Sequence, residues 1–197
     1  KGKTIMGKLL APTQEEMMQD EKEHMELARK LAAECVVLLE NDGVLPLRKT
    51  SGEIALYGAG ARKTVKGGTG SGDVNSRFVV NVEEGLQEAG YTITTGDWLS
   101  RQDDRVENAK KEHRSILHRM SEETGKPEFL LEFGMPFQEP APEPVTEEDL
   151  EKSAADTAIY VLSRNSGEGA DRYAKAGDYL LWEEEEKSIR KLADFYP

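Results

Sequence analysis

The sequence is poor in residues that support several common kinds of site. Cys35 is the only cysteine among 197 residues, which excludes an intrachain disulfide and a dithiol redox pair. It ends an apolar stripe at helical spacing that begins at Leu27, and this pattern predicts a buried, unreactive thiol. The three histidines have no His-x-x-x-His or Cys-x-x-Cys companions, which argues against a zinc site. We expect no metal and no organic cofactor.

Basic residues are in the minority. The chain has 38 Asp and Glu against 26 Lys and Arg, a net charge of -12. Nucleic acid and anionic membrane surfaces call for a basic patch, so neither is expected as a partner. No apolar run approaches the roughly 20 residues that cross a bilayer, and residues 1–6 lack the apolar core of a signal peptide. A soluble, cytoplasmic protein is expected, although a chain whose signal peptide had been removed would look the same.

Helix and strand signals alternate along the chain. Residues 1–12 are expected to form an arm, after which Thr13 and Glu16 have the capping-box spacing of a helix start. Strands are predicted over residues 53–58, 91–95 and 157–162, with helices over 82–89, 103–123 and 182–193. The acidic run 183–186 is expected to face water. This alternation predicts one α/β domain, a mainly parallel sheet between layers of helices.

Proline is concentrated in one part of the chain. Five of the eight prolines fall within residues 124–146, which predicts an extended, solvated excursion from the domain. The apolar residues in the first half of this segment, from Phe129 to Phe137, are consistent with a loop that covers the protein's own core or with packing across another surface. Thr146 followed by Asp149 then predicts the start of the next helix.

A glutamate lies between two glycines just after the strand at 157–162. Residues 163–172 read Ser-Arg-Asn-Ser-Gly-Glu-Gly-Ala-Asp-Arg, with Glu168 in the centre. Open α/β sheets bind ligands beyond the carboxyl ends of their strands, and glycines let a substrate approach closely. A carboxyl group held there can donate a proton. This decapeptide alone is equally compatible with a surface glutamate in a flexible loop.

Three further motifs precede this one in a fixed order. Val-Val-Leu-Leu-Glu-Asn-Asp-Gly-Val-Leu-Pro-Leu occupies 36–47, Glu-Ile-Ala-Leu-Tyr-Gly occupies 53–58, and Gly-Gly-Thr-Gly-Ser-Gly-Asp-Val occupies 67–74. Together with Ser-Gly-Glu-Gly-Ala-Asp-Arg they resemble the second, α/β-sandwich domain of glycoside hydrolase family 3, the β-glucosidases and their relatives. The resemblance covers residues 25–95 and 147–195 and implies a three-layer α/β/α fold.

The resemblance implies a retaining, exo-acting β-glycosidase whose substrate is a β-linked glucoside or a related oligosaccharide. Such enzymes use one carboxylic acid to protonate the departing oxygen and a second carboxylate to attack the sugar. Glu168 matches the general acid/base. Ser71 matches a sugar contact, with Thr69 and Gly70 beside it in the glycine loop; a plain turn is the alternative for this loop.

Charged residues flank both loops. Asp171 and Arg172 are expected to hold the acid loop in place, Arg172 through charge-assisted hydrogen bonds to a carboxylate or to carbonyls and Asp171 by accepting backbone N–H groups. An exposed ion pair is the alternative. Arg62, Lys63 and Lys66 precede the glycine loop, where they either line the same cleft or are solvated.

The glycine loop also invites comparison with nucleotide-binding motifs. Residues 67–72 lack the glycine spacing of a dinucleotide fingerprint and the Gly-Lys-Ser/Thr ending of a P-loop. A nucleotide-binding enzyme is therefore the weakest functional class.

Gly96-Asp97-Trp98 is similar to the Ser-Asp-Trp signature that carries the family's nucleophilic aspartate. That residue belongs to a separate (β/α)8 barrel of about 250 residues, for which this chain has no room. Asp97 is expected in a loop or at a helix cap. The chain is therefore expected to be a fragment that is inactive alone and is completed by the barrel of the same polypeptide. The alternative is a non-catalytic carbohydrate-binding or interaction module with the same fold.

Overall fold

A computed structural model describes residues 16–47, 52–68, 72, 74, 76–166 and 171–196. The chain divides into two compact units, residues 1–48 and 49–197, which are described separately.

The first unit contains helix α1 (Gln19–Glu34). The helix starts later than the spacing of Thr13 and Glu16 predicts, because the Glu21 carboxylate instead accepts the backbone N–H of Met18 at 2.8 Å. No residue of α1 is buried and Cys35 is exposed, so the prediction of a buried thiol was wrong. The helical stripe was present, but nothing described covers it.

The second unit is built on a three-stranded parallel sheet in the order β2-β1-β3. Its strands are β1 (Gly52–Tyr57), β2 (Tyr91–Ile93) and β3 (Ala158–Tyr160). Gly52 pairs with Tyr91, and Ala55 pairs with Ala158. The central strand is buried from Ile54 to Tyr57, as expected of an apolar strand covered on both faces. The predicted parallel α/β fold is confirmed, although β2 and β3 are shorter than predicted.

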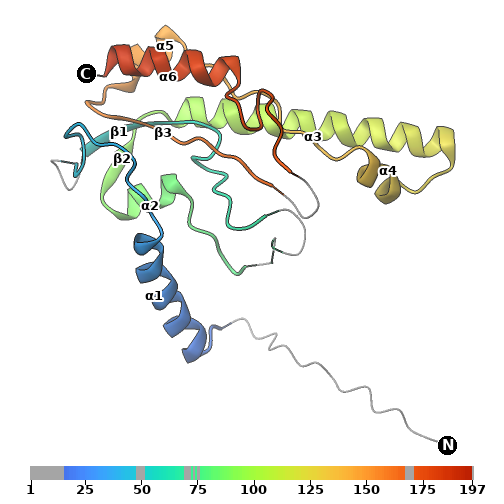
Figure 1. The fold of residues 1–197 in the computed structure, drawn as a ribbon, viewed down its shortest axis with the longest axis horizontal. Helices are drawn as coiled ribbons and strands as arrows, with labels where there is room; N and C mark the ends of the chain where they lie inside the picture. Colours follow the sequence, from blue (N-terminus) through green and yellow to red (C-terminus); the bar gives the residue numbers. More distant parts are fainter. Residues whose placement is uncertain are drawn as a thin grey trace, which may run out of the picture. The chain divides into compact units, whose positions relative to one another are not determined.

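Five helices of this unit accompany the sheet: α2 (Val82–Glu88), α3 (Gly96–Thr124), α4 (Glu128–Gly134), α5 (Glu147–Ser153) and α6 (Glu183–Phe195). Figure 1 shows α5 and α6 on one side of the sheet and α2 on the other. Leu150 of α5 and Leu192 of α6 join the buried cluster around Leu56. Helices therefore cover both faces, as the alternation of elements indicates.

Helix α3 is longer and more buried than its charged sequence predicts. It starts at Gly96 rather than near Asp103, and its first turns bury Trp98, Leu99 and Val106. The Trp98 ring meets the Tyr57 ring edge to face, with centroids 5.3 Å apart. One face of α3 thus belongs to the core.

The proline-rich segment is not a solvated connector. It contains α4, and its last residues are held against α3 and α6 by hydrogen bonds from backbone N–H groups to side-chain oxygens. The Glu143 N–H donates to Gln102 Oε1 at 2.7 Å, and the N–H of buried Val145 donates to Ser188 Oγ at 3.1 Å. Phe129 and Phe133 of α4, by contrast, are 60% and 84% exposed, so they do not cover the core.

Candidate active site

The carboxyl ends of β1 and β3 meet through backbone contacts. The Val161 N–H donates to the Tyr57 carbonyl at 2.9 Å, and the Gly60 N–H donates to the Val161 carbonyl at 3.1 Å. Gly58 makes this possible, because a Cβ at that position would lie 2.4 Å from the Val161 oxygen. The two chain segments that leave these strands therefore start side by side.

The glycine loop is drawn together at its base. A Cβ on Gly67 would lie 2.3 Å from the Gly72 carbonyl oxygen, so the two ends of the loop are in close contact. The Lys66 ammonium donates to the Val74 carbonyl and, at 3.2 Å, to Ser76 Oγ. Lys66 thus braces the loop from the side on which the chain leaves it.

The ends of the glycine loop and the acid loop also touch. A Cβ on Gly68 would lie 2.7 Å from the Ser166 carbonyl oxygen, a distance that only glycine permits. Gly68 is the second residue of the glycine loop, and Ser166 lies two residues before Glu168. The sheet therefore brings the described flanks of both predicted site loops to one edge, as expected for ligand-binding loops of parallel sheets.

Four of the predicted site residues, Thr69, Gly70, Ser71 and Glu168, lie outside the described residues. Asp171 and Arg172 are described, and both are exposed. The Arg172 Nη1 donates to Asp178 Oδ1 at 2.9 Å, in an ion pair whose two side chains are 32% and 15% exposed.

A buried ion pair supports the other flank of the acid loop. Arg164 donates from Nη1 to Glu185 Oε1 at 2.9 Å and from Nη2 to Glu185 Oε2 at 2.5 Å. Glu185 is only 2% exposed, so the prediction that the acidic run 183–186 faces water is wrong at this residue. Its first-turn position in α6 also lets Glu185 accept the Trp182 N–H at 2.9 Å.

A signal for this pair was available in the sequence. Arg164 is the only basic residue between Thr157 and Asp171, directly after an apolar strand. A cation in that place calls for a carboxylate nearby, because a half-buried charge without a partner is costly. The sequence does not reveal which of four consecutive glutamates is the partner.

The end of β3 also buries a phenol. The Tyr160 hydroxyl is inaccessible and has no hydrogen-bond partner among the described residues. Burial, followed by the negative charge of Glu185, raises the pKa of Tyr160 above its ordinary value. The phenol therefore stays neutral beside the ion pair.

Arg62 and Lys63 contact other parts of the fold and do not line a cleft in the part of the chain that the structure describes. Arg62 binds Glu83 of α2 at 2.5 Å and Asp103 of α3 at 3.0 Å, and so ties two helices to the end of β1. The Lys63 ammonium is buried and has no hydrogen-bond partner among the described residues, and desolvation, followed by the charge of Lys110, lowers its pKa.

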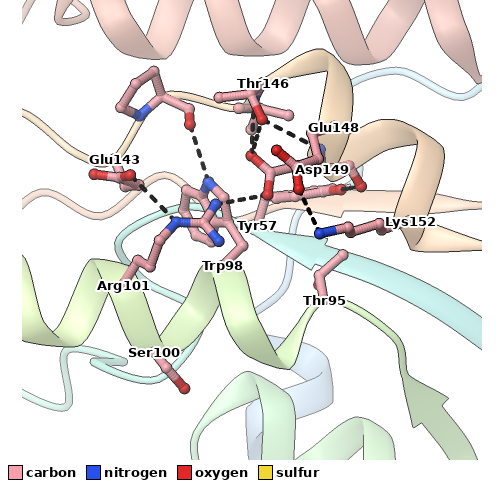
Figure 2. Close-up of polar contacts among 12 residues, drawn as sticks. Tyr57, Thr95, Trp98, Ser100, Arg101, Glu143, Thr146, Glu148, Asp149 and Lys152 are labelled. Carbon is pink, nitrogen blue, oxygen red and sulfur yellow. Dashed lines mark hydrogen bonds and ion pairs between the residues drawn. The ribbon is translucent and has the colours of Figure 1, made fainter.

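A polar hollow of about 290 Å³ lies between α3 and α5 and includes Asp97. Figure 2 shows Arg101 between Glu143 and Asp149. Arg101 donates to Asp149 at 2.6 Å, and Lys152 binds Glu148 at 2.5 Å, so both cations in the hollow already have partners.

Asp97 itself is exposed in the first turn of α3, one residue beyond Gly96. A carboxylate there is favoured by the helix dipole. Asp97 is thus in the helix rather than in a loop or at the cap, which is Thr95.

The described residues contain no group of three or more His, Cys, Asp or Glu side chains that could hold a metal ion. None of their helices is both long and apolar enough to cross a membrane.

Comparison with known proteins gives consistent results. The sequence model of the "Glycosyl hydrolase family 3 C-terminal domain" matches residues 36–196. The chain is 37% identical over 153 residues to beta-glucosidase A of Butyrivibrio fibrisolvens, covering 77% of this chain and 16% of that protein. It is 36% identical over 180 residues to a beta-glucosidase of Ruminococcus albus, covering 89% of this chain and 17% of that protein.

A solved structure is also similar. Beta-glucosidase 3B from Thermotoga neapolitana, in complex with alpha-D-glucose, matches with a TM-score of 0.63 and 31% identity. The match covers 91% of this chain and 23% of that one. This chain therefore spans less than a quarter of the length of the relatives it matches.

Proposed function

The chain belongs to glycoside hydrolase family 3, as a C-terminal domain of that family, and on this basis we propose that it supplies the general acid/base of a retaining, exo-acting β-glucosidase. The acid/base is Glu168. The observation that carries the proposal is the contact of Gly68 with Ser166, because it brings the flanks of the glycine loop and the acid loop to one edge of the sheet.

The chemistry assigns Glu168 two proton transfers. In the first step a carboxylate nucleophile attacks the anomeric carbon while Glu168 gives its proton to the glycosidic oxygen, and the alcohol leaves. In the second step Glu168 removes a proton from water, and the resulting attack releases the sugar from the nucleophile. Ser71, with Thr69 and Gly70, holds the sugar during both steps.

The acid must carry its proton near neutral pH. A glutamate does so only if its pKa is raised, and desolvation is the usual cause. We infer that a sugar and a second domain close over Glu168 and exclude water.

The nucleophile comes from a (β/α)8 barrel domain of the same polypeptide. The much greater length of the similar β-glucosidases supports this inference. The two carboxyl groups would stand about 5 Å apart, as a retaining mechanism requires. The substrate is a β-linked glucoside or a related oligosaccharide.

The test is the substitution Glu168→Gln in the polypeptide that joins this chain to its barrel. With a 4-methoxyphenyl glucoside, whose leaving group needs a proton, kcat/KM should fall by about 10²- to 10⁴-fold. With a 2,4-dinitrophenyl glucoside, which needs none, the glycosyl-enzyme should still form and then accumulate.

The matched control is Glu151→Gln, which changes an exposed carboxylate of α5. It should leave kcat/KM for the 4-methoxyphenyl glucoside and glycosyl-enzyme formation from the 2,4-dinitrophenyl glucoside unchanged. Hydrolysis of the 4-methoxyphenyl glucoside by Glu168→Gln at the unaltered rate would remove Glu168 from the acid/base role.

A further inference from the structure

Asp178 binds both flanks of the acid loop. Its main-chain carbonyl accepts Arg164 Nε at 2.8 Å, and its Oδ1 accepts Arg172 Nη1 at 2.9 Å. Arg164 precedes Glu168 in the chain and Arg172 follows it. One residue outside the loop therefore joins the two points between which the loop runs.

Asp178 is itself held in a tight turn. Its Oδ2 accepts the Tyr173 N–H at 2.9 Å, and its own N–H donates to the Lys175 carbonyl at 3.2 Å. The preceding Gly177 has φ +76°, and a Cβ there would lie 2.2 Å from the Trp182 ring. The turn thus has little room to move.

The contacts of the Asp178 carboxylate also favour its ionised form. The Tyr173 N–H and then the Arg172 guanidinium hold the pKa of Asp178 below its ordinary value. Asp178 is therefore an anion at neutral pH, and both of its carboxylate oxygens are occupied by donors from the far flank of the loop.

The near flank has a second anchor in α6. Arg164 donates from Nη1 to the Ser163 carbonyl at 2.8 Å and binds buried Glu185 with both terminal nitrogens. Arg164 thus connects the end of β3, the Asp178 turn and the first turn of α6. We call Arg164, Arg172, Asp178 and Glu185 the loop clamp.

We propose that Asp178 is a positioning residue that orients Glu168 by fixing both ends of the acid loop through the loop clamp. This inference rests on the proposed function. Fixing the two ends of a short segment removes much of its conformational freedom. Proton transfer depends steeply on position, since an error of about 1 Å can cost about 10²-fold in rate. Loss of the clamp should therefore slow proton transfer more than it weakens sugar binding.

The first measurement is amide hydrogen exchange of the 197-residue chain. Asp178→Ala should speed exchange on the far flank of the loop, over residues 171–173, since Arg172 and Tyr173 both lose their acceptor while Arg164 keeps the main-chain carbonyl. Asp178→Asn keeps one side-chain oxygen, so its exchange rates should lie between those of Asp178→Ala and the unaltered chain. The control, Glu186→Gln, breaks the exposed Glu186–Arg190 pair of α6 and should leave these amides unchanged. Unaltered exchange in Asp178→Ala would overturn the proposal.

The second measurement compares two glucosides with different leaving groups as substrates of the polypeptide that contains the barrel. Asp178→Ala should lower kcat for the 4-methoxyphenyl glucoside by about 10-fold, with KM changed by less than about twofold. Glycosyl-enzyme formation from the 2,4-dinitrophenyl glucoside should change by less than about twofold, because it needs no proton. Asp178→Asn should recover part of kcat for the first substrate.

Equal losses on both substrates would indicate a general structural defect and overturn the positioning role. A Glu168→Gln variant run in parallel separates the two proposals. If Glu168→Gln discriminates between the leaving groups and Asp178→Ala does not, only the clamp inference fails. If Glu168→Gln does not discriminate either, the acid/base assignment fails with it.

Discussion

Gly58 directly follows β1 and has a φ of +95°, in the left-handed region that favours glycine. Its missing side chain leaves space for the Val161 backbone, which closes the end of β3 against the end of β1. The placement of the described flanks of both predicted site loops at one edge of the sheet therefore depends on a residue that takes no part in the proposed chemistry.

Gly58→Ala should destabilise the chain by about 2 kcal/mol or more, because it combines an unfavourable φ with a clash against backbone. Urea unfolding measures the loss. Gly96→Ala is the matched control, since a Cβ there meets nothing within 4 Å, and its effect should stay within about 1 kcal/mol. Similar losses for the two variants would contradict this account of Gly58.

Glu185 shows the limit of prediction at the scale of one residue. Four consecutive glutamates at a helix start are typical of a solvated face, and the neighbouring Glu183 and Glu186 do pair on the exposed surface with Lys187 and Arg190. Glu185 differs because its position on α6 points it toward Arg164. Local composition is the same for all four residues, so only the packing of α6 distinguishes them.

At the scale of elements, the start of helix α5 is predicted by its local sequence and also makes contacts with other elements of the fold. Thr146 and Asp149 form the expected capping box, with the Asp149 N–H donating to Thr146 Oγ1 at 3.2 Å and the Thr146 N–H donating to Asp149 Oδ2 at 2.9 Å. Asp149 then adds an ion pair to Arg101 of α3, and its carbonyl accepts the Tyr57 hydroxyl at 3.3 Å. One short helix start thereby connects α5, α3 and β1.

This arrangement has a pH dependence with a definite sign. Burial alone would raise the pKa of Asp149, but hydrogen bonds from Thr146 and Arg101 outweigh it and hold the pKa below its ordinary value. A carboxyl group whose pKa is lower in the folded than in the unfolded chain stabilises the folded state at pH values above its unfolded pKa of about 3.9. This contribution is lost as the pH falls through the pKa of the folded state.

Asp149→Asn should therefore lower the free energy of unfolding by about 1 kcal/mol at neutral pH, and the difference from the unaltered chain should shrink below about pH 4. Urea unfolding over this pH range tests it. Glu151→Gln, on the exposed side of the same helix, should show no such dependence. A difference that stays constant with pH would mean that the Asp149 charge is irrelevant.

The α3–α4 region shows where sequence signals are weakest. The charges of α3 hide its buried face, and prolines obscure both α4 and the packed segment that ends at Val145. Proline interrupts the interior of helices and sheets, but it does not prevent an extended segment from burying side chains and donating the N–H groups of its other residues. The predicted solvation failed for this reason.

At the scale of the whole molecule, this chain covers 16% and 17% of two similar β-glucosidases. Under the proposed function it supplies the acid/base, one of the two carboxyl groups that a retaining mechanism needs, and a barrel domain supplies the other. Substrate choice and turnover would then depend on surfaces that the barrel contributes.

The isolated 197-residue chain should accordingly show no hydrolysis of 4-nitrophenyl β-glucoside above the buffer rate, because the proposed nucleophile belongs to the barrel domain. Release of 4-nitrophenolate at high protein concentration measures this. The control is the same chain with Glu168→Gln, which should be indistinguishable. Turnover that disappears in the control would mean that a nucleophile is present in the chain itself.

The sequence by itself determined the alternation of strands and helices, the parallel sheet, the capping box of α5 and membership of the family. These follow from periodicity, from turn residues and from motifs whose order is written in the chain. Only the tertiary structure decided that α3 has a buried face, that Glu185 rather than its neighbours meets Arg164, and that Asp178 joins both flanks of the acid loop. The physical reason is that pairing between charges depends on which surfaces meet in space, and residues with the same local composition receive different partners there.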